Sequence, residues 1–282
     1  MNPEQIIETQ RQDWNRVAPA WERWDRFFDR NLAFINYRLV GDARLCNGQR
    51  VLDLGSGTGY PALLAARAVG DQGTVVGLDL AEAMLATARR KAQTLGLINI
   101  RFQSADVTTL PFDTASFAAV ISRFCLMFLP DVPKAVGDIA RVLKPGGYVA
   151  AAVWSTPDKN PYLRIPMDVV KQFIELPPPD PEQPGIFRLA NPGDLRVMAE
   201  RTGLQGVADD EITGEATFDS ADEYVTSLME LAAPLQTLFA KLTPPQRSEA
   251  ESRIKRTADQ YRTGGKVFLP MAIRIVVARK PA

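Results

Sequence analysis

The stretch that decides the fold runs from Val51 to Gly59 and reads VLDLGSGTG. It is a short apolar run that leads into a turn with a glycine at every second position. Short apolar runs are typical of buried strands, and glycines let the backbone approach a ligand closely. A helix that follows such a turn presents unpaired N–H groups at its N-terminus. The stretch therefore predicts a strand, a ligand-binding turn and a helix.

The chain after this turn alternates between short apolar runs and helical stretches, which is typical of βαβ units and a parallel sheet. We expect strands at 50–54, 74–79, 100–103, 117–122, 147–153, 206–217 and 267–278, and helices at 60–69, 81–95, 133–142, 161–175 and 193–202. A KPGG turn at 144–147 is expected to lead into the fifth strand. The pattern predicts an α/β fold with a mostly parallel, Rossmann-like sheet.

Three segments lie outside this alternation. Residues 1–45 are expected to form an N-terminal helical segment that packs on the domain as an amphipathic element, forms an aromatic lid over a ligand, or does both. The proline-rich residues 176–185 are expected to form a loop or a polyproline stretch. Residues 219–265 are expected to be a helical insertion that caps the core or simply packs on it. The core is then 46–218 together with 266–282.

The composition excludes several kinds of chemistry. The chain has 282 residues and no histidine, so it cannot form a Ser-His-Asp triad or a His-ligated metal site. Its two cysteines are not a CxxC pair, so we expect no metal site. The 33 basic residues balance the 33 acidic ones, and no basic arm is present, so neither nucleic acid nor an anionic membrane is an expected partner.

The N-terminus has no apolar signal segment, and no stretch approaches the roughly 18 uncharged apolar residues of a spanning helix. We therefore expect a soluble, cytoplasmic protein, monomeric or homodimeric, with a small molecule as its partner.

Two kinds of ligand suit the glycine turn, and two residues discriminate between them. A dinucleotide-binding GxGxxG turn would need glycine at position 60, where the chain has Tyr60. The carboxylate of Asp53 would repel a pyrophosphate but attract an ammonium or sulfonium group. An NAD-dependent oxidoreductase is therefore the less favoured alternative.

The run DxGxGxG at 53–59 resembles the first motif of class I S-adenosylmethionine-dependent methyltransferases. The resemblance continues with Asp79, 20 positions after Gly59, which implies an acceptor for the ribose hydroxyls. It also implies that Asp106 and Val107 contact the adenine. The resemblance implies S-adenosylmethionine as cofactor, S-adenosylhomocysteine as product, and these binding residues: Asp53, Gly55, Ser56, Gly57, Thr58, Gly59, Asp79, Leu80, Met84, Asp106, Val107 and Ser122.

The segment at 110–117 and the KPGG turn are similar to the branch of this family that includes ubiquinone and menaquinone biosynthesis methyltransferases. The resemblance implies a seven-stranded sheet with the last strand antiparallel. It also implies transfer of the methyl group, by in-line SN2 displacement, to oxygen or carbon of a small aromatic, quinone-like or polyketide-like acceptor. Two alternatives stay open: N-methylation of a small amine, and a protein that binds the cofactor without catalysis.

Catalytic residues are not identified by these motifs, because an activated methyl group needs mainly an aligned nucleophile and a pocket that excludes water. Tyr60, Arg123 and Tyr162 are candidates near the expected carboxyl-end face, although each of them could serve packing or pairing instead. Trp14, Trp21 and Phe124 are expected to contact the substrate or to form the lid.

Overall fold

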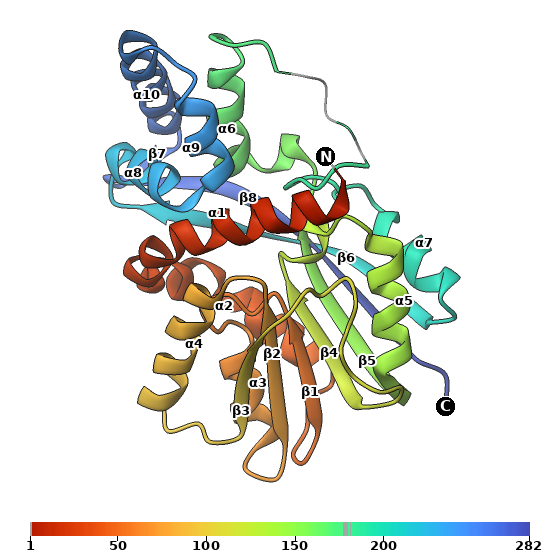
Figure 1. Cartoon of the computed structure of the whole chain (residues 1–282). Coiled ribbons are helices and arrows are strands. Elements are labelled where there is room, and N and C mark those ends of the chain that lie inside the picture. Colours follow the sequence, from red (N-terminus) through yellow and green to blue (C-terminus); the bar gives the residue numbers. More distant parts are fainter. Residues whose placement is uncertain (1, 177–179, 181) are drawn as a thin grey trace.

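The structure, a computed structural model, describes residues 2–176, 180 and 182–282. Its centre is one sheet with the strand order β3-β2-β1-β4-β5-β8-β6, and the short strand β7 pairs with β8 (Figure 1). The strands are β1 Arg50–Leu54, β2 Thr74–Asp79, β3 Ile100–Ser104, β4 Phe117–Arg123, β5 Leu143–Trp154, β6 Gln205–Phe218, β7 Arg262–Thr263 and β8 Lys266–Arg279. Strands β1 to β5 are parallel, whereas β8 is antiparallel to both β5 and β6. This confirms the predicted fold class, including the antiparallel last strand.

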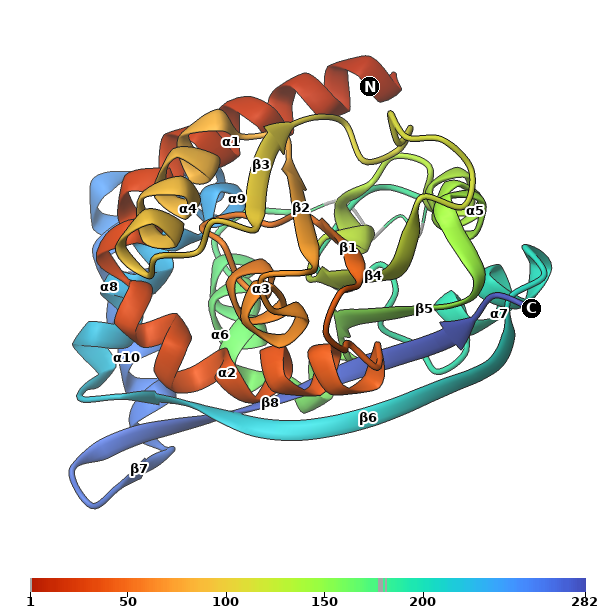
Figure 2. The same ribbon diagram turned by 90° about the horizontal axis from the view of Figure 1, so that it is seen from below.

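Helices cover both faces of the sheet because parallel strands bury both of their faces. Figure 2 shows α2, α3 and α4 on one face and α5 and α7 on the other. The helices and 3-10 turns are α1 Pro3–Arg23, α2 Asp25–Asp42, α3 Ala62–Val69, α4 Glu82–Thr94, η1 Leu126–Phe128, α5 Val132–Val142, η2 Pro157–Lys159, α6 Pro161–Val170, α7 Asp194–Arg201, α8 Ala221–Leu231, α9 Ala233–Phe239 and α10 Pro244–Asp259. No helix in the described ranges is both long and apolar enough to cross a membrane.

The N-terminal helical segment is two helices rather than one, and they meet at Trp24. Helix α1 runs across the ends of the parallel strands, and α2 turns back to pack on the face of the sheet (Figure 1). The turn lets each helix bury its own apolar side: Val17 and Ala18 pack on α4, whereas Ile35 and Leu39 lie in the main core. One straight helix could not reach both surfaces.

Strand β5 begins earlier than expected, at Leu143. The KPGG residues form an irregularity within the strand, between the pairs Phe117–Leu143 and Ala119–Tyr148. The left-handed backbone of Gly146, at φ +76°, allows this bulge. The proline-rich segment is described only in part, because 177–179 and 181 lie outside the described residues.

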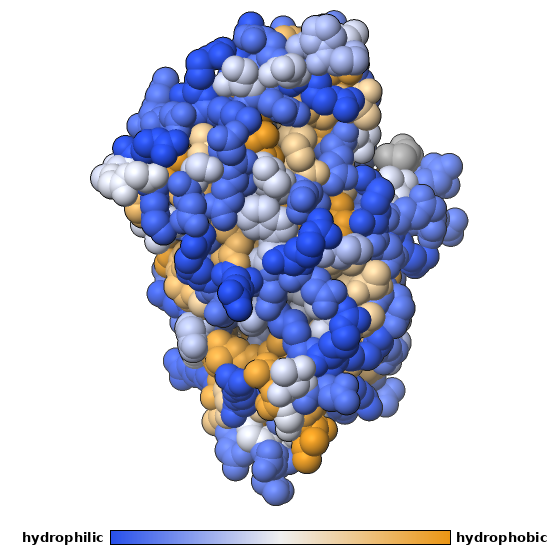
Figure 3. All heavy atoms as spheres, turned by 90° about the vertical axis from the view of Figure 1, so that its left-hand side faces the viewer, coloured by the Kyte–Doolittle hydropathy of each residue, from blue (hydrophilic) through white to orange (hydrophobic). Residues whose placement is uncertain are grey.

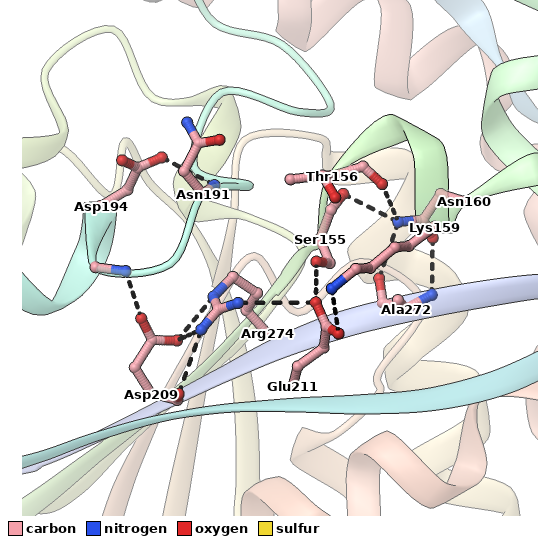
Figure 4. A network of polar contacts seen from close by, with 11 residues as sticks. Ser155, Thr156, Lys159, Asn160, Asn191, Asp194, Asp209, Glu211, Ala272 and Arg274 are labelled. Carbon is pink, nitrogen blue, oxygen red and sulfur yellow. Dashed lines mark hydrogen bonds and ion pairs between the residues drawn. The ribbon is translucent and has the colours of Figure 1, made fainter.

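A network of polar contacts joins the end of β5 to the antiparallel strands (Figure 4). The amide nitrogen of Asn160 donates to the carbonyls of Ser155, Thr156 and Ala272, and its oxygen accepts from the N–H of Ala272. These bonds fix the start of α6. Beside them, the guanidinium of Arg274 contacts a carboxylate oxygen of Asp209 at 2.6 Å, with both side chains at least 93% buried (7% and 6% exposed).

Candidate active site

The glycine turn sits where β1 ends, held by backbone bonds to the neighbouring strand. The N–H groups of Gly55 and Ser56 both donate to the carbonyl of Leu78, at 2.8 and 2.9 Å. Gly55 has φ +72°, and a Cβ atom there would lie 2.4 Å from that of Cys125. Gly57 has φ +49°, and a Cβ atom there would meet no atom within 4 Å. The turn is therefore tightly packed at its first glycine and open at its second.

Asp53 is the most unusual residue beside this turn. Its side chain is completely buried, and neither carboxylate oxygen has a hydrogen-bond partner among the described residues. Burial raises the pKa of Asp53 to about 7, although the nearby Ser56 side chain, the positive charge of Arg123 and the backbone of Ala62 act in the opposite direction. A buried carboxylate without partners is costly, and a cationic ligand would offset that cost. The ammonium group of S-adenosylmethionine is such a cation.

Asp79 ends the adjacent strand and faces the same turn. Its Oδ2 atom accepts from the N–H of Gly57 at 2.8 Å, and its Oδ1 atom accepts from the N–H of Ala81 at 2.9 Å. A carboxylate has about four acceptor positions, so two remain for ligand hydroxyls. Burial raises the pKa of Asp79, and its bonds to backbone N–H groups oppose that shift. The position suits the ribose role that the motif implies.

The other predicted cofactor residues lie in the loop after β3, at the end of β4 and in the glycine turn itself. Asp106 accepts from both the N–H and the hydroxyl of Thr108, so its carboxylate is turned toward its own loop. Val107 is buried, and the buried Ser122 donates to the carbonyl of Leu54 at 3.1 Å. Three further residues lie close to the turn: Ser56 and Thr58 are buried in it, and Leu80 follows Asp79. Gly59 donates to the carbonyl of Ser56 at 2.8 Å.

Met84 lies in the first turn of α4 but packs in a cluster with Val17 and Ala18 of α1. Its side chain therefore contacts the helix that crosses the site. The resemblance implies that Met84 contacts the cofactor. The structure adds that α1 covers the side chain of Met84.

Tyr60 and Arg123 form one cationic and aromatic group beside Asp53. The ring of Tyr60 lies 3.7 Å from the ammonium nitrogen of Lys91 and 5.7 Å from the guanidinium carbon of Arg123. Arg123 also donates to the side-chain oxygen of Asn36 in α2 at 2.9 Å. Burial raises the pKa of Tyr60 to about 12 and lowers that of Arg123 to about 10. At neutral pH the phenol is protonated and the guanidinium is charged, so neither group is a base.

Phe124 and Tyr162 belong to an aromatic cluster at the ends of β4 and β5. Phe124, with a left-handed φ of +57°, stacks on Trp154 with ring centres 4.2 Å apart. The ring of Tyr162 lies about 6 Å from those of Trp154, Phe218 and Tyr224. Burial raises the pKa of Tyr162, so its phenol stays protonated as well. Trp154, Phe218 and Tyr224 are buried, whereas Phe124 and Tyr162 are half-buried.

Trp14 and Trp21 lie on the part of α1 that crosses the site. Their rings meet edge to face at 5.7 Å, and Trp14 makes a similar contact with Phe128. Trp21 stacks on Phe28 and donates its indole N–H to the carbonyl of Leu231 in α8 at 3.2 Å. Helix α1 is thus held against η1, α2 and α8 at once.

The structure adds three site residues that sequence reasoning missed. Asn15 of α1 accepts from the backbone N–H of Ala83 at 2.9 Å and so satisfies one of the free N–H groups that begin α4. Asn36 orients Arg123, and Trp154 stacks on Phe124. Trp154 could have been found, because it ends a strand expected beside the one that precedes Phe124. Nothing in the sequence marks Asn15 or Asn36.

These features together define an α/β protein with a nucleoside-type binding edge, in which a glycine turn lies between two acidic strand ends. A family model described as "Methyltransferase domain" matches residues 51–147, which contain the glycine turn and both acidic strand ends. With the relatives below, the match shows that the chain belongs to the class I S-adenosylmethionine-dependent methyltransferases.

Relatives with curated names agree with this family. A demethylmenaquinone methyltransferase of Thermus thermophilus is 44% identical over 151 residues, which are 53% of this chain and 67% of the relative. A ubiquinone/menaquinone biosynthesis C-methyltransferase, UbiE, of Vibrio campbellii is 39% identical over 42% of this chain. The aklanonic acid methyltransferase DauC of a Streptomyces species is 40% identical over 48% of this chain. The match covers only 46% of the Vibrio protein and 63% of the Streptomyces protein.

Solved structures share the fold at lower identity. A phosphoethanolamine N-methyltransferase 2 of Haemonchus contortus matches 98% of this chain and 59% of its own, with a TM-score of 0.59 and 22% identity. The [4+2]-cyclase SpnF matches 88% of this chain and 80% of its own, with a TM-score of 0.54 and 21% identity. Since a cyclase has this fold too, the fold alone does not determine the reaction.

Proposed function

We propose that this chain binds S-adenosylmethionine and transfers its methyl group to a small organic acceptor. One observation carries the proposal: the two buried, unpartnered oxygens of Asp53 lie beside a glycine turn that is open at Gly57. A dinucleotide would bring its pyrophosphate to this turn and be repelled, whereas a cofactor with an ammonium group would be attracted.

The chain's own residues would hold the cofactor at three points. Asp53 would accept from the ammonium group, Asp79 from the ribose hydroxyls, and the loop that carries Asp106 and Val107 would line the adenine. When bound, the cofactor supplies an activated methyl group on a sulfonium. The surrounding protein then has to place an acceptor in line with that group and exclude water.

None of the three predicted catalytic candidates is suited to act as a general base. Tyr60 and Tyr162 have raised pKa values, and Arg123 is a cation at neutral pH. Their chemistry suits donation of hydrogen bonds, which can orient an acceptor oxygen. The proposed reaction therefore favours acceptors that are already nucleophilic or that lose their proton to solvent.

The aromatic cluster favours an aromatic or quinone-like acceptor. The half-buried rings of Phe124 and Tyr162, packed on the buried Trp154, would provide stacking surfaces at the end of the sheet where open α/β folds bind their ligands. Relatives whose names refer to ubiquinone, menaquinone and aklanonic acid support a ring acceptor and transfer to carbon or oxygen.

We assign the role of lid to residues 1–45 and the role of cap to residues 219–265. Helix α1 crosses the ends of the strands, and α8 and α9 pack on its far side (Figure 1). Trp14 and Trp21 stand on the lid, where they would exclude water from the methyl group. The remainder, 46–218 and 266–282, would then be the binding core.

Two measurements test the proposal. Calorimetry with S-adenosylmethionine should show micromolar binding, and the same titration with NADH should show none. The protein is then incubated with the cofactor and phenolic, quinol or amine acceptors, and mass spectrometry follows the added methyl group and S-adenosylhomocysteine. Binding of NADH alone would refute the cofactor assignment. Transfer only to amines would favour N-methylation, and binding without any product would favour a non-catalytic role.

A further inference from the structure

A surface cavity of about 340 Å³ lies where α1, α2 and α8 meet. Its walls are Arg23, Trp24, Arg26, Phe27, Arg30 and Glu223. None of them belongs to the glycine turn or to the sheet. The junction of α1 and α2 is on the left of Figure 1, the side that faces the viewer in Figure 3, and that face is mostly hydrophilic. The volume is at the lower end of the range for small-molecule sites.

The charges around this cavity do not balance. Arg23 pairs with Glu230 at 3.0 Å, and Arg30 donates to the carbonyl of Thr217 at 2.8 Å. Arg26 makes no ion pair and no side-chain hydrogen bond with the part of the chain that the structure describes. Glu223 is the one acidic residue in the wall, and its carboxylate already accepts from the N–H of Asp219. Arg26 therefore faces the cavity without a carboxylate partner among the described residues, whereas Arg30 lies near enough to Asp219 to help lower the pKa of that carboxyl.

Guanidinium groups bind phosphate oxygens with paired, planar hydrogen bonds. Several of them around one cavity repel each other unless an anion lies between them, and a doubly charged phosphate offsets that repulsion better than a single carboxylate. We propose that this cavity binds the phosphate group of a small molecule or lipid, with Arg26 as its principal ligand. Trp24 and Phe27 provide an apolar wall for the rest of the molecule.

The phosphate site is separate from the proposed methyl-transfer site but shares a wall with it. Phe27 stacks on Phe218 with ring centres 5.0 Å apart, and Phe218 lies against Tyr162 and Tyr224 of the aromatic cluster. The inference depends on the arginines alone, so it holds whichever acceptor is methylated.

The test uses the full chain at low ionic strength with two probes. Calorimetry measures binding of inorganic pyrophosphate, and co-sedimentation measures binding to phosphatidylglycerol vesicles, with phosphatidylcholine vesicles as the neutral comparison. Arg26→Gln removes a charged donor and should weaken binding about tenfold or more. Arg201→Gln is the matched control, since Arg201 is an exposed arginine outside the cavity. Because Arg26 lies in the segment assigned as the lid, affinity for S-adenosylmethionine is measured in both variants, and a loss confined to the phosphate probes supports the site.

Each outcome of the binding test either supports or overturns the phosphate site. Weaker binding in Arg26→Gln but not in Arg201→Gln supports the site. If pyrophosphate binding is weakened, the ligand is a free phosphate compound, and if vesicle binding is weakened, it is a lipid headgroup. Equal loss in both variants would show a general charge effect and overturn the proposal. Absence of binding to either probe would overturn it as well.

Discussion

The protein alone does not stabilise the ionised form of Asp53. Its folded-state pKa of about 7 is above the usual value of 3.8, because burial disfavours the carboxylate. The folded chain therefore binds a proton that the unfolded chain releases between about pH 4 and 7. Over that range Asp53 makes folding less favourable as the pH rises. A cationic ligand reverses this effect because it stabilises the ionised form.

Affinity for S-adenosylmethionine should consequently depend on pH. Below about pH 7 the cofactor must displace a proton from Asp53, so affinity should fall by up to tenfold for each pH unit. Above that pH it should level off. Calorimetry at pH 5.5, 6.5 and 8 measures the profile.

Asp53→Asn is the control for this prediction. The amide cannot titrate, so the variant should bind more weakly at pH 8 and should lose the pH dependence. A wild-type profile that is flat from pH 8 to pH 5.5 would show that Asp53 does not meet the ammonium group.

Asp79→Ala should weaken cofactor binding by about tenfold or more, because charged hydrogen bonds contribute roughly 1.5 to 3 kcal/mol. The loss includes the bond that fixes the N–H of Gly57. Asp71→Ala, at an exposed position outside the turn, is the matched control. If calorimetry gives the same affinity for both variants, the ribose assignment is wrong.

The sequence predicts individual residues where a motif fixes their spacing. Asp53, Gly57 and Asp79 were predicted as binding residues from the resemblance of their motifs to the family, and the structure brings Gly57 and Asp79 into contact. The contact of Asn36 with Arg123 joins positions 87 apart, and no local pattern encodes such a pair. The assigned roles of all these residues remain predictions until ligand binding is measured.

At the scale of elements, a buried ion pair links the paired strands β6 and β8. Arg274 on β8 contacts Asp209 on β6, and the carboxylate of Asp209 also accepts from the N–H of Gly193 at 2.7 Å. A buried ion pair adds little net stability, but loss of one partner leaves the other charge buried and unpaired. Replacement of Arg274 or Asp209 alone should therefore destabilise the folded protein (Figure 4).

Arg274→Met should lower the free energy of unfolding by about 3 to 5 kcal/mol. Urea unfolding followed by circular dichroism measures the change. The double variant Asp209→Leu and Arg274→Met should recover part of the loss, because it leaves no lone charge.

Arg196→Met provides the matched control for this element. Its guanidinium pairs with Glu200 on the surface, with 52% and 47% of the side chains exposed. Exposed pairs contribute about 1 kcal/mol or less, so this variant should be nearly as stable as the wild type. Equal losses from Arg274→Met and Arg196→Met would contradict the burial argument.

Strands and helices of the core were predictable because their apolar periodicity is strong, and most observed boundaries differ from the predicted ones by one or two residues. The break at Trp24 was not predictable, since helical periodicity continues on both sides of it. The irregular start of β5 depends on its register against β4, which no local pattern specifies.

At the scale of the whole molecule, a ligand that binds only the folded chain raises its stability. Cofactor at a hundred times its dissociation constant should add about 2.7 kcal/mol to the free energy of unfolding. For a chain of this size, that corresponds to a rise in Tm of about 5 °C. Thermal unfolding with and without S-adenosylmethionine measures it.

NADH at the same concentration should leave Tm unchanged, and Asp79→Ala should show about half of the wild-type rise or less. A rise that Asp79→Ala retains in full would indicate that the cofactor binds elsewhere on the molecule.

The ends of the insertion that carries α8, α9 and α10 are neighbours in the sheet, since Phe218 pairs with Val267. Strand pairing, and not the inserted helices, holds the two ends together. A different segment can therefore be exchanged between the same two positions without altering the connectivity of the glycine turn or of the acidic strand ends. If the proposed cap contacts the acceptor, recombination at these two positions would change the choice of acceptor and leave the glycine turn and the acidic strand ends as they are.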